Sequence, residues 1–166
     1  MSWVALRRLA LLLCLSGCGP ETSAPSFPIE LYVTAGLLDD ITSFQLSLVT
    51  RGTLLDCVAV QKACIKDQVD ATRFVKLKDS AGKDVQSLTF PIVLVAGAPN
   101  TQDVTLKDLP LGKDLALIVE AVSKEATPRL AGSSCNYLKE LTAGTNPTVG
   151  ARIEVLSPRV GCDPRH

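Results

Sequence analysis

Cysteine is the residue type in this chain with the clearest chemical potential. Six cysteines occur among the 166 residues, two of them near the N-terminus and four further along. The last four, Cys57, Cys64, Cys135 and Cys162, form an even set that can close two disulfides or bind one zinc ion as thiolates. Their spacings do not match the short two-cysteine knuckles typical of Cys₄ zinc sites. We therefore expect two disulfides and no metal ion.

The pairing of these cysteines depends on the structure of residues 56–66. A straight helix would hold Cys57 and Cys64 about 10.5 Å apart along its axis, beyond the roughly 7 Å that a disulfide spans between Cα atoms. Either the segment is a bent loop closed by a Cys57–Cys64 disulfide, or it is helical and both cysteines pair elsewhere. We favour the loop, which leaves Cys135–Cys162 as the second disulfide.

Residues 1–17 have the pattern of a signal peptide. Arg7 and Arg8 precede an apolar run, Leu9–Leu15, which is far shorter than the ~20 residues that span a bilayer. The run ends in Leu15-Ser16-Gly17-Cys18, which resembles the lipobox of bacterial lipoproteins. The resemblance implies cleavage before Cys18, a diacylglycerol thioether on its sulfur and acylation of the new amino terminus. Several acyl chains on one residue anchor a protein stably to a membrane.

Residues 18–26 are then the lipidated cysteine and a linker, and residues 27–166 are one domain. The linker is small, polar and proline-containing, and eight residues extend at most about 28 Å. The domain is therefore expected close to the membrane surface. In enteric-type sorting an Asp after the cysteine retains a lipoprotein at the inner membrane, so Gly19 favours the outer membrane. An exported domain also favours oxidised cysteines.

Groups suited to catalysis are scarce. The chain has one histidine, His166, and only 4% aromatic residues, which disfavours imidazole-based chemistry and sugar-stacking platforms. The sequence Ser80-Ala81-Gly82-Lys83 fits the Ser-x-x-Lys pattern of penicillin-binding enzymes, but their Ser-Asp-Asn and Lys-Thr-Gly motifs are absent. Basic and acidic residues number 17 each, so the basic footprint of a nucleic-acid-binding protein is missing. We expect no enzyme, no cofactor and no nucleic-acid partner.

Three acidic pairs could in principle bind calcium: Asp39 with Asp40, Asp67 with Asp70, and Asp79 with Asp84. They lack the alternating acidic pattern of a calcium-binding loop. Asp is common in turns because its side chain accepts hydrogen bonds from nearby backbone N–H groups. We therefore expect solvated turn carboxylates at these positions.

Apolar and polar residues alternate along much of the chain beyond Phe27, as they do in half-buried strands. Pro91 suggests an edge strand or a bulge, and 78–84 has the composition of a hairpin turn. The pattern predicts an all-β fold, an antiparallel sandwich of about seven strands. The alternating segments are 29–33, 44–48, 75–78, 88–94, 115–121 and 149–155.

Residues 104–121 resemble the strand–turn–strand corner of fibronectin type III and related immunoglobulin-like domains. The turn Leu109-Pro110-Leu111-Gly112 leads there into an alternating strand, and transthyretin-like and carboxypeptidase-regulatory sandwiches share this turn. The resemblance implies a single immunoglobulin-like β-sandwich. Those domains usually carry Tyr where Leu115 stands, so the hydrogen bond from the tyrosine hydroxyl to the corner cannot form here.

These features predict a membrane-anchored lipoprotein of the cell envelope whose sandwich is a non-catalytic structural or protein-interaction module. Its partners would be the membrane, through the lipid on Cys18, and an unknown envelope protein. The alternative function is the binding of a small ligand or metal ion. The longest irregular stretches, 50–71 and 123–147, are the candidate binding loops.

Overall fold

The computed structural model describes residues 23–93 and 100–165. The signal peptide, the lipobox and Cys18 lie outside the described residues. Strands make up 51% of the described residues and helices 12%, which confirms that the fold is mostly β. The seven main strands are β1 (Phe27–Val33), β2 (Ile41–Thr50), β5 (Leu88–Pro91), β6 (Thr101–Leu106), β7 (Gly112–Ser123), β8 (Leu130–Leu141) and β9 (Val149–Val160).

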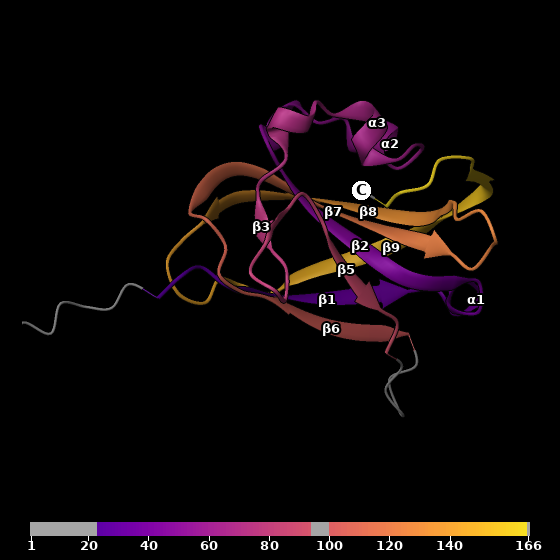
Figure 1. Ribbon diagram of the computed structural model, residues 1–166, viewed down its shortest axis with the longest axis horizontal. Coiled ribbons are helices and arrows are strands. Elements are labelled where there is room, and N and C mark those ends of the chain that lie inside the picture. The colour runs from indigo at the N-terminus through magenta and orange to yellow at the C-terminus, as the bar shows by residue number, and fades with distance from the viewer. Residues whose placement is uncertain (1–22, 94–99, 166) are drawn as a thin grey trace, which may run out of the picture.

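Short elements fill the connections between these strands (Figure 1). The strands β3 (Leu77–Lys78) and β4 (Asp84–Val85) form a small hairpin. The helices are α1 (Ala35–Leu38), α2 (Cys57–Val60) and α3 (Ile65–Gln68), and the 3₁₀ turns are η1 (Gly52–Leu54) and η2 (Ala71–Arg73). Among the residues that the structure describes, none of the helices has the length and apolar character to cross a membrane.

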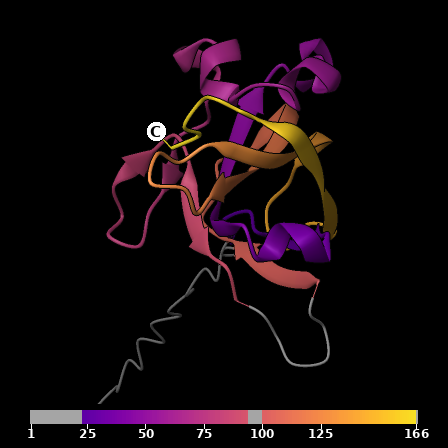
Figure 2. The same ribbon diagram turned by 90° about the vertical axis from the view of Figure 1, so that its right-hand side faces the viewer.

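The seven main strands form one mixed sheet in the order β5-β2-β7-β8-β9-β1-β6. Strand β1 runs parallel to β9, with Ile29 opposite Val149, and antiparallel to β6, with Ile29 opposite Val104. Figure 2 shows the sheet curled around its own interior as a half-barrel. The expectation of an antiparallel sandwich is therefore wrong. A sandwich needs two separate sheets, whereas the ladder from β8 through β9 to β1 keeps all seven strands in one sheet.

The concave side of the sheet holds the larger of two apolar cores. Strand β1 contributes Ile29 and Leu31, which are 1% exposed, and its alternate residues Glu30 and Tyr32 point away from this core, as the alternation predicts. The fully buried side chains of this core include Phe27, Phe44, Leu46, Leu48, Leu77, Leu106, Leu117 and Val119.

The convex side of β2 and β7 is also buried, because residues 51–74, which we call the cap, lie across it. Ala116 and Ile118 face the cap, whereas Leu115 and Leu117 face the concave core. Strand β7 is consequently buried at every position from 115 to 123. The second core consists of Val49, Val60, Ile65, Val69, Phe74, Ala116 and Ile118.

The alternating segments at 29–33, 44–48, 115–121 and 149–155 lie in β1, β2, β7 and β9, as predicted. Residues 78–84 join β3 to β4, which confirms the hairpin, and β5, which ends at Pro91, is an edge strand. The prediction of an irregular stretch at 123–147 is wrong, because it contains the twelve residues of β8. That strand pairs with β7 on one side and β9 on the other, an environment set by distant strands rather than by local sequence.

Candidate functional site

The cap is a loop whose two ends meet on strand β2. The guanidinium of Arg73 donates hydrogen bonds to the carbonyls of Thr50, at 2.9 Å, and Arg51, at 3.1 Å. Phe74 then forms an isolated antiparallel β-bridge with Val49 of β2. At its start the cap approaches β7 so closely that a Cβ on Gly52 would lie 2.4 Å from the carbonyl oxygen of Leu115. Glycine is therefore needed at position 52.

Side chains at the start of each turn hold the cap in shape. The Asp56 carboxylate accepts hydrogen bonds from the N–H groups of Val58 and Ala59 and so caps α2. Asp70 does the same for η2 by accepting from Thr72. Asp at the first position of a helical turn satisfies N–H groups that have no partner within the turn.

Two disulfides attach the cap to the rest of the domain. They join Cys57 at the start of α2 to Cys135 of β8, and Cys64 before α3 to Cys162 beyond β9. The expected formation of two disulfides is confirmed, and the expected pairs Cys57–Cys64 and Cys135–Cys162 are wrong. The segment contains two short helices: α2 begins at Cys57, and α3 begins directly after Cys64. Each cysteine pairs with a different, distant partner. This is the arrangement that the helical alternative predicted.

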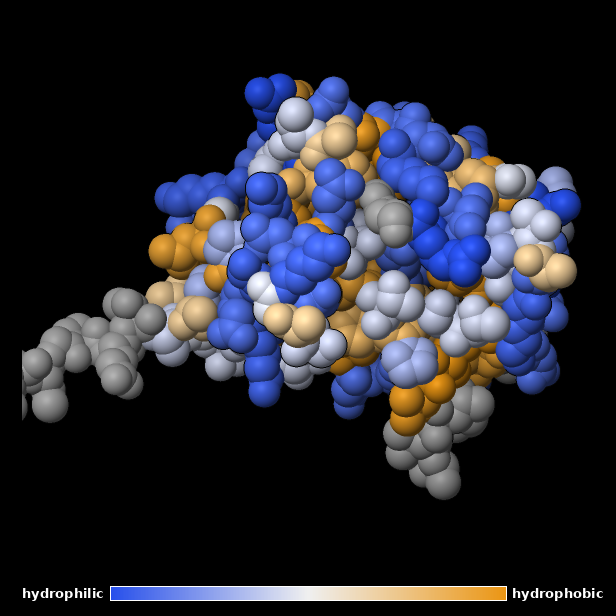
Figure 3. Space-filling view, in the orientation of Figure 1, coloured by the Kyte–Doolittle hydropathy of each residue, from blue (hydrophilic) through white to orange (hydrophobic). Residues whose placement is uncertain are grey.

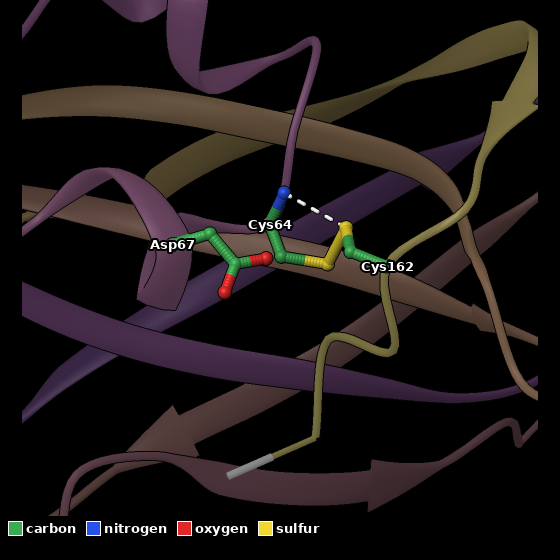
Figure 4. A group of neighbouring side chains, drawn as sticks. All are labelled: Cys64, Asp67 and Cys162. Atoms are coloured by element: carbon green, nitrogen blue, oxygen red, sulfur yellow. Dashed lines mark hydrogen bonds between the residues drawn. A yellow bond between two sulfur atoms is a disulfide. The ribbon is translucent and has the colours of Figure 1, made fainter.

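Cys64, Asp67 and Cys162 come together beneath α3. One ligand atom from each residue lies within 4.8 Å of the others, and Figure 4 shows the Asp67 carboxylate beside the disulfide. The backbone N–H of Cys64 also donates to the Cys162 sulfur at 3.0 Å. Because the two sulfurs are bonded to each other, neither is a thiolate, and Asp67 is left as the one anionic ligand. The oxidised group does not suit a zinc ion, which prefers four N or S ligands in structural sites.

A row of polar side chains crosses the sheet beneath the cap. Gln45 of β2 stands opposite Glu120 of β7, and Glu120 stands opposite Ser133 of β8. All three are at most 1% exposed, as is Ser47, two residues along β2 from Gln45. The Gln45 amide donates to the carbonyl of Pro164, so the C-terminal segment covers this end of the row.

Glu120 has one clear hydrogen bond in this row. The N–H of Ile65 donates to Oε1 at 2.8 Å, while Oε2 and the hydroxyls of Ser47 and Ser133 have no partner among the described residues. Burial away from water raises the pKa of Glu120 to about 7, although the hydrogen bond from Ile65 and the charge of Lys66 act in the opposite direction. The carboxyl group thus takes up a proton near neutral pH.

The signal for this buried acid is present in the sequence. Glu120 is the one charged residue within the apolar run 115–121, and a charge inside a strand buried on both faces must be neutralised or paired. The alternation over 115–121 predicted a half-buried strand, which places Glu120 on the opposite face from Leu115, Leu117 and Val119. The prediction missed the row because 50–71 was expected to be an irregular stretch and a candidate binding loop, and not a cap over β2 and β7.

A cleft separates the two edge strands of the half-barrel. It has a volume of about 530 Å³ and lies between Leu88–Phe90 of β5 and Thr105–Leu106 of β6, next to the β3–β4 hairpin. Further along, the side chain of Gln102 joins the edges, because it donates to the carbonyl of Pro91 at 3.0 Å and accepts from the N–H of Val93 at 2.9 Å. Among the described residues, the side chain of Gln102 thus bridges the two edges at one end, and the cleft lies between them at the other.

The first described residues are fixed at one end of the domain, on the left in Figure 1. The Pro25 carbonyl accepts from the N–H of Leu109 at 3.1 Å, and the Ser26 N–H donates to the carbonyl of Gly144 at 2.9 Å. The buried side chain of Asn146 donates to Ser26 and Gly144 and accepts from Thr142. Residues 23–26 are thus held between the β6–β7 turn and the β8–β9 loop. We call these three segments, 23–26, 109–112 and 142–148, the tip.

The opposite end of the domain carries a network of charges. Arg159 pairs with Asp40 at 2.6 Å and also with Glu125. Glu125 in turn pairs with Arg129 at 3.1 Å, and the Lys124 ammonium donates to the carbonyl of Asp39. These groups join α1, the β7–β8 turn and β9.

The acidic pairs considered for calcium have other structural roles in the described residues. Asp79 accepts from the N–H groups of Ala81 and Lys83 within the hairpin turn. Asp84 forms an ion pair with Lys78 across the same hairpin, and this pairing lowers its pKa. Asp79 and Asp84 are thus turn and hairpin carboxylates.

Comparisons with known proteins give no relative from which a role could be transferred. The sequence matches no family model, and no curated protein and no solved structure is significantly similar to it. The functional argument therefore depends on the residues and geometry of this chain alone.

Proposed function

We propose that this chain is a lipid-anchored protein of the cell envelope, held at the outer membrane through Cys18, whose domain binds another envelope protein and catalyses no reaction. The observation that carries the proposal is the sequence Leu15-Ser16-Gly17-Cys18 directly after a short apolar run. A diacylglycerol thioether and an acylated amino terminus at Cys18 would provide enough buried hydrocarbon for stable anchoring.

The anchoring is tested by removing the thiol. In the Cys18→Ser variant we expect the protein to move from the membrane fraction to the soluble fraction, and mass spectrometry of the native N-terminal peptide should give the mass of an acylated Cys18. The Cys14→Ser variant is the matched control, because position 14 lies within the predicted signal peptide. An unmodified Cys18 in the native protein would contradict the proposal.

A non-catalytic role is supported by the position of the buried acid. Glu120 has a pKa near the pH at which general acids and bases work, yet it is 1% exposed and lies under the cap. Its side chain is therefore shielded from solvent in the described structure, and the Cys64–Cys162 disulfide attaches the cap that covers it. The raised pKa of Glu120 is therefore better explained by burial than by catalysis.

The cleft between β5 and β6 supports a protein partner. Edge strands have backbone N–H and C=O groups that can pair with an extended segment of another protein. Here two edges of one sheet line the same cleft, which has a volume of about 530 Å³. A strand entering this cleft would find backbone partners on both sides, with Leu88 and Phe90 to pack against.

Site-specific photo-crosslinking tests this binding surface. A photoreactive residue at Thr105, on the edge of β6, should give one discrete crosslinked product in intact envelopes. The same residue at Thr127, exposed in the β7–β8 turn at the other end of the domain, should give none. Equal labelling from the two positions, or labelling from Thr127 alone, would place the partner elsewhere.

The cleft also gives the small-ligand alternative a specific location, because its volume is within the range of ordinary ligand pockets. Equilibrium dialysis and thermal shift with calcium, zinc and envelope metabolites would separate the two functions. Saturable binding that Thr105→Arg abolishes and Thr127→Arg leaves intact would favour the ligand.

A further inference from the structure

We infer that the tip of the domain lies on the surface of the membrane, with Leu111 inserted among the lipids of the leaflet that holds Cys18. This inference rests on the proposed lipid anchor and adds the orientation of the domain and the residues that contact lipid.

The first step is the length of chain between the anchor and the domain. Residues 23–26 are fixed to the tip by backbone hydrogen bonds to Leu109 and Gly144. Only five peptide units separate Cys18 from residue 23, and they can span at most about 18 Å. The linker of 19–26 was expected to allow about 28 Å, so the docking of 23–26 shortens the tether. Residue 23, at the tip, must therefore stay within about 18 Å of the Cα atom of Cys18.

The second step is the composition of the tip. None of the residues in 23–26, 109–112 and 142–148 is charged, although charged residues make up 20% of the chain. Leu111 is 67% exposed, and Pro110 and Ala143 beside it are exposed as well. Figure 3 shows apolar atoms on the surface at this left-hand end. Partial burial of an exposed leucine in the lipid interface is favourable. The Lys113–Glu140 ion pair lies next to Leu111 and is exposed, so it can stay at the level of the polar headgroups.

The third step is the contrast with the far end of the same strands. Strand β7 has twelve residues, which at about 3.3 Å per residue separate the two ends by roughly 35–40 Å. The far end carries the paired charges of Asp40, Glu125, Arg129 and Arg159, which suit water. The chain therefore has one end fit for a lipid surface and one end fit for solvent, and the tether leads to the first.

Tryptophan fluorescence tests the orientation with the complete mature protein, lipidated at Cys18. Processing at Cys18 would remove Trp3, the only tryptophan of the chain, so one substitution supplies a unique probe. Leu111→Trp places it at the tip, and Ala126→Trp places it in the exposed β7–β8 turn as the matched control. Each protein is reconstituted in phosphatidylethanolamine–phosphatidylglycerol vesicles, with and without lipids that carry a doxyl quencher.

We expect the tryptophan at 111 to shift its emission to the blue, to be quenched by doxyl lipid and to lose several-fold in quenching by aqueous iodide. The tryptophan at 126 should keep its emission, escape the doxyl lipid and remain fully open to iodide. Equal iodide quenching at both positions in a protein with acylated Cys18 would overturn the orientation and leave the anchor intact. An unmodified Cys18 in the same preparation would overturn both.

Discussion

The two faces of strands β2 and β7 are stabilised in different ways. On the concave face, 21 of the described residues form one apolar core. On the convex face the apolar core has seven residues, and beside it lies the polar row that contains Gln45, Glu120 and Ser133. Both disulfides of the domain attach the cap over this second face. The comparison indicates that apolar burial holds the concave side together, whereas cross-links hold the convex side.

Among the changes considered, removal of a disulfide should destabilise the convex face the most. The disulfides close loops with sequence separations of 78 and 98, for which the chain-entropy model gives about 4.5 kcal/mol each. We expect Cys64→Ala with Cys162→Ala to lower the free energy of unfolding in urea by about that amount. Hydrogen exchange should show the amides of 52–74 losing protection before those of β7. A loss below about 1 kcal/mol would mean that burial alone holds the cap.

Alanine substitutions at two neighbouring residues allow the stability of the two apolar cores to be compared directly. Leu117 and Ile118 are both fully buried on β7 and face opposite sides. Leu117→Ala should cost about 2–5 kcal/mol, because it leaves a cavity in the larger and more rigid core. Ile118→Ala should cost less, since the short helices of the cap can settle into the space. Urea unfolding measures both changes in the free energy of unfolding. A larger loss for Ile118→Ala would mean that the core under the cap, and not the concave core, is the more rigid one.

The buried acid should give the convex face its own pH dependence. Burial raises the pKa of Glu120 from 4.5 to about 7 in the folded state, so the folded protein holds the proton more tightly than the unfolded chain does. The contribution of Glu120 to the free energy of unfolding should therefore be greatest below pH 4.5 and fall by about 3 kcal/mol as the pH rises to 7.

Glu120→Gln should abolish that slope, because the amide does not ionise. The matched control is Glu154→Gln, an exposed position of strand β9 opposite Ser133, which should leave the slope unchanged. Thermal unfolding between pH 4 and 8 measures all three proteins. A slope that persists in Glu120→Gln would assign the titration to another group.

The smallest effect is expected from a polar atom without a partner. The Ser47 hydroxyl is fully buried and has no hydrogen bond within the described residues, so Ser47→Ala should change stability by less than about 0.5 kcal/mol or increase it. Asn146→Ala at the tip is the control, because that side chain bonds to Ser26 and Thr142, and it should cost about 1–3 kcal/mol. A loss above about 1 kcal/mol for Ser47→Ala would indicate a hidden partner.

The sequence predicted the strands whose alternation reflects one buried face, such as β1. It could not predict that Ala116 and Ile118 are buried as well, because the cap that covers them is held by cysteines far apart in the chain. Nor could it predict the parallel pairing of β1 with β9, since alternation specifies which side of a strand is buried and not which strand lies next to it. The pairing of Cys57 with Cys135 was missed for the same reason.

The parallel pairing of β1 with β9 also determines the order in which the two edges of β1 can be paired during synthesis. Ile29 and Val149 are neighbours in the sheet and 120 residues apart in the chain, so a nascent chain presents β1 long before its partner has been synthesised. The antiparallel pairing of β1 with β6 can form earlier and shelter one side of it. Until β9 arrives the other side stays available to other molecules, which is a known route to aggregation. A chaperone that covers the free edge of β1 until β9 has been synthesised would therefore prevent aggregation most effectively.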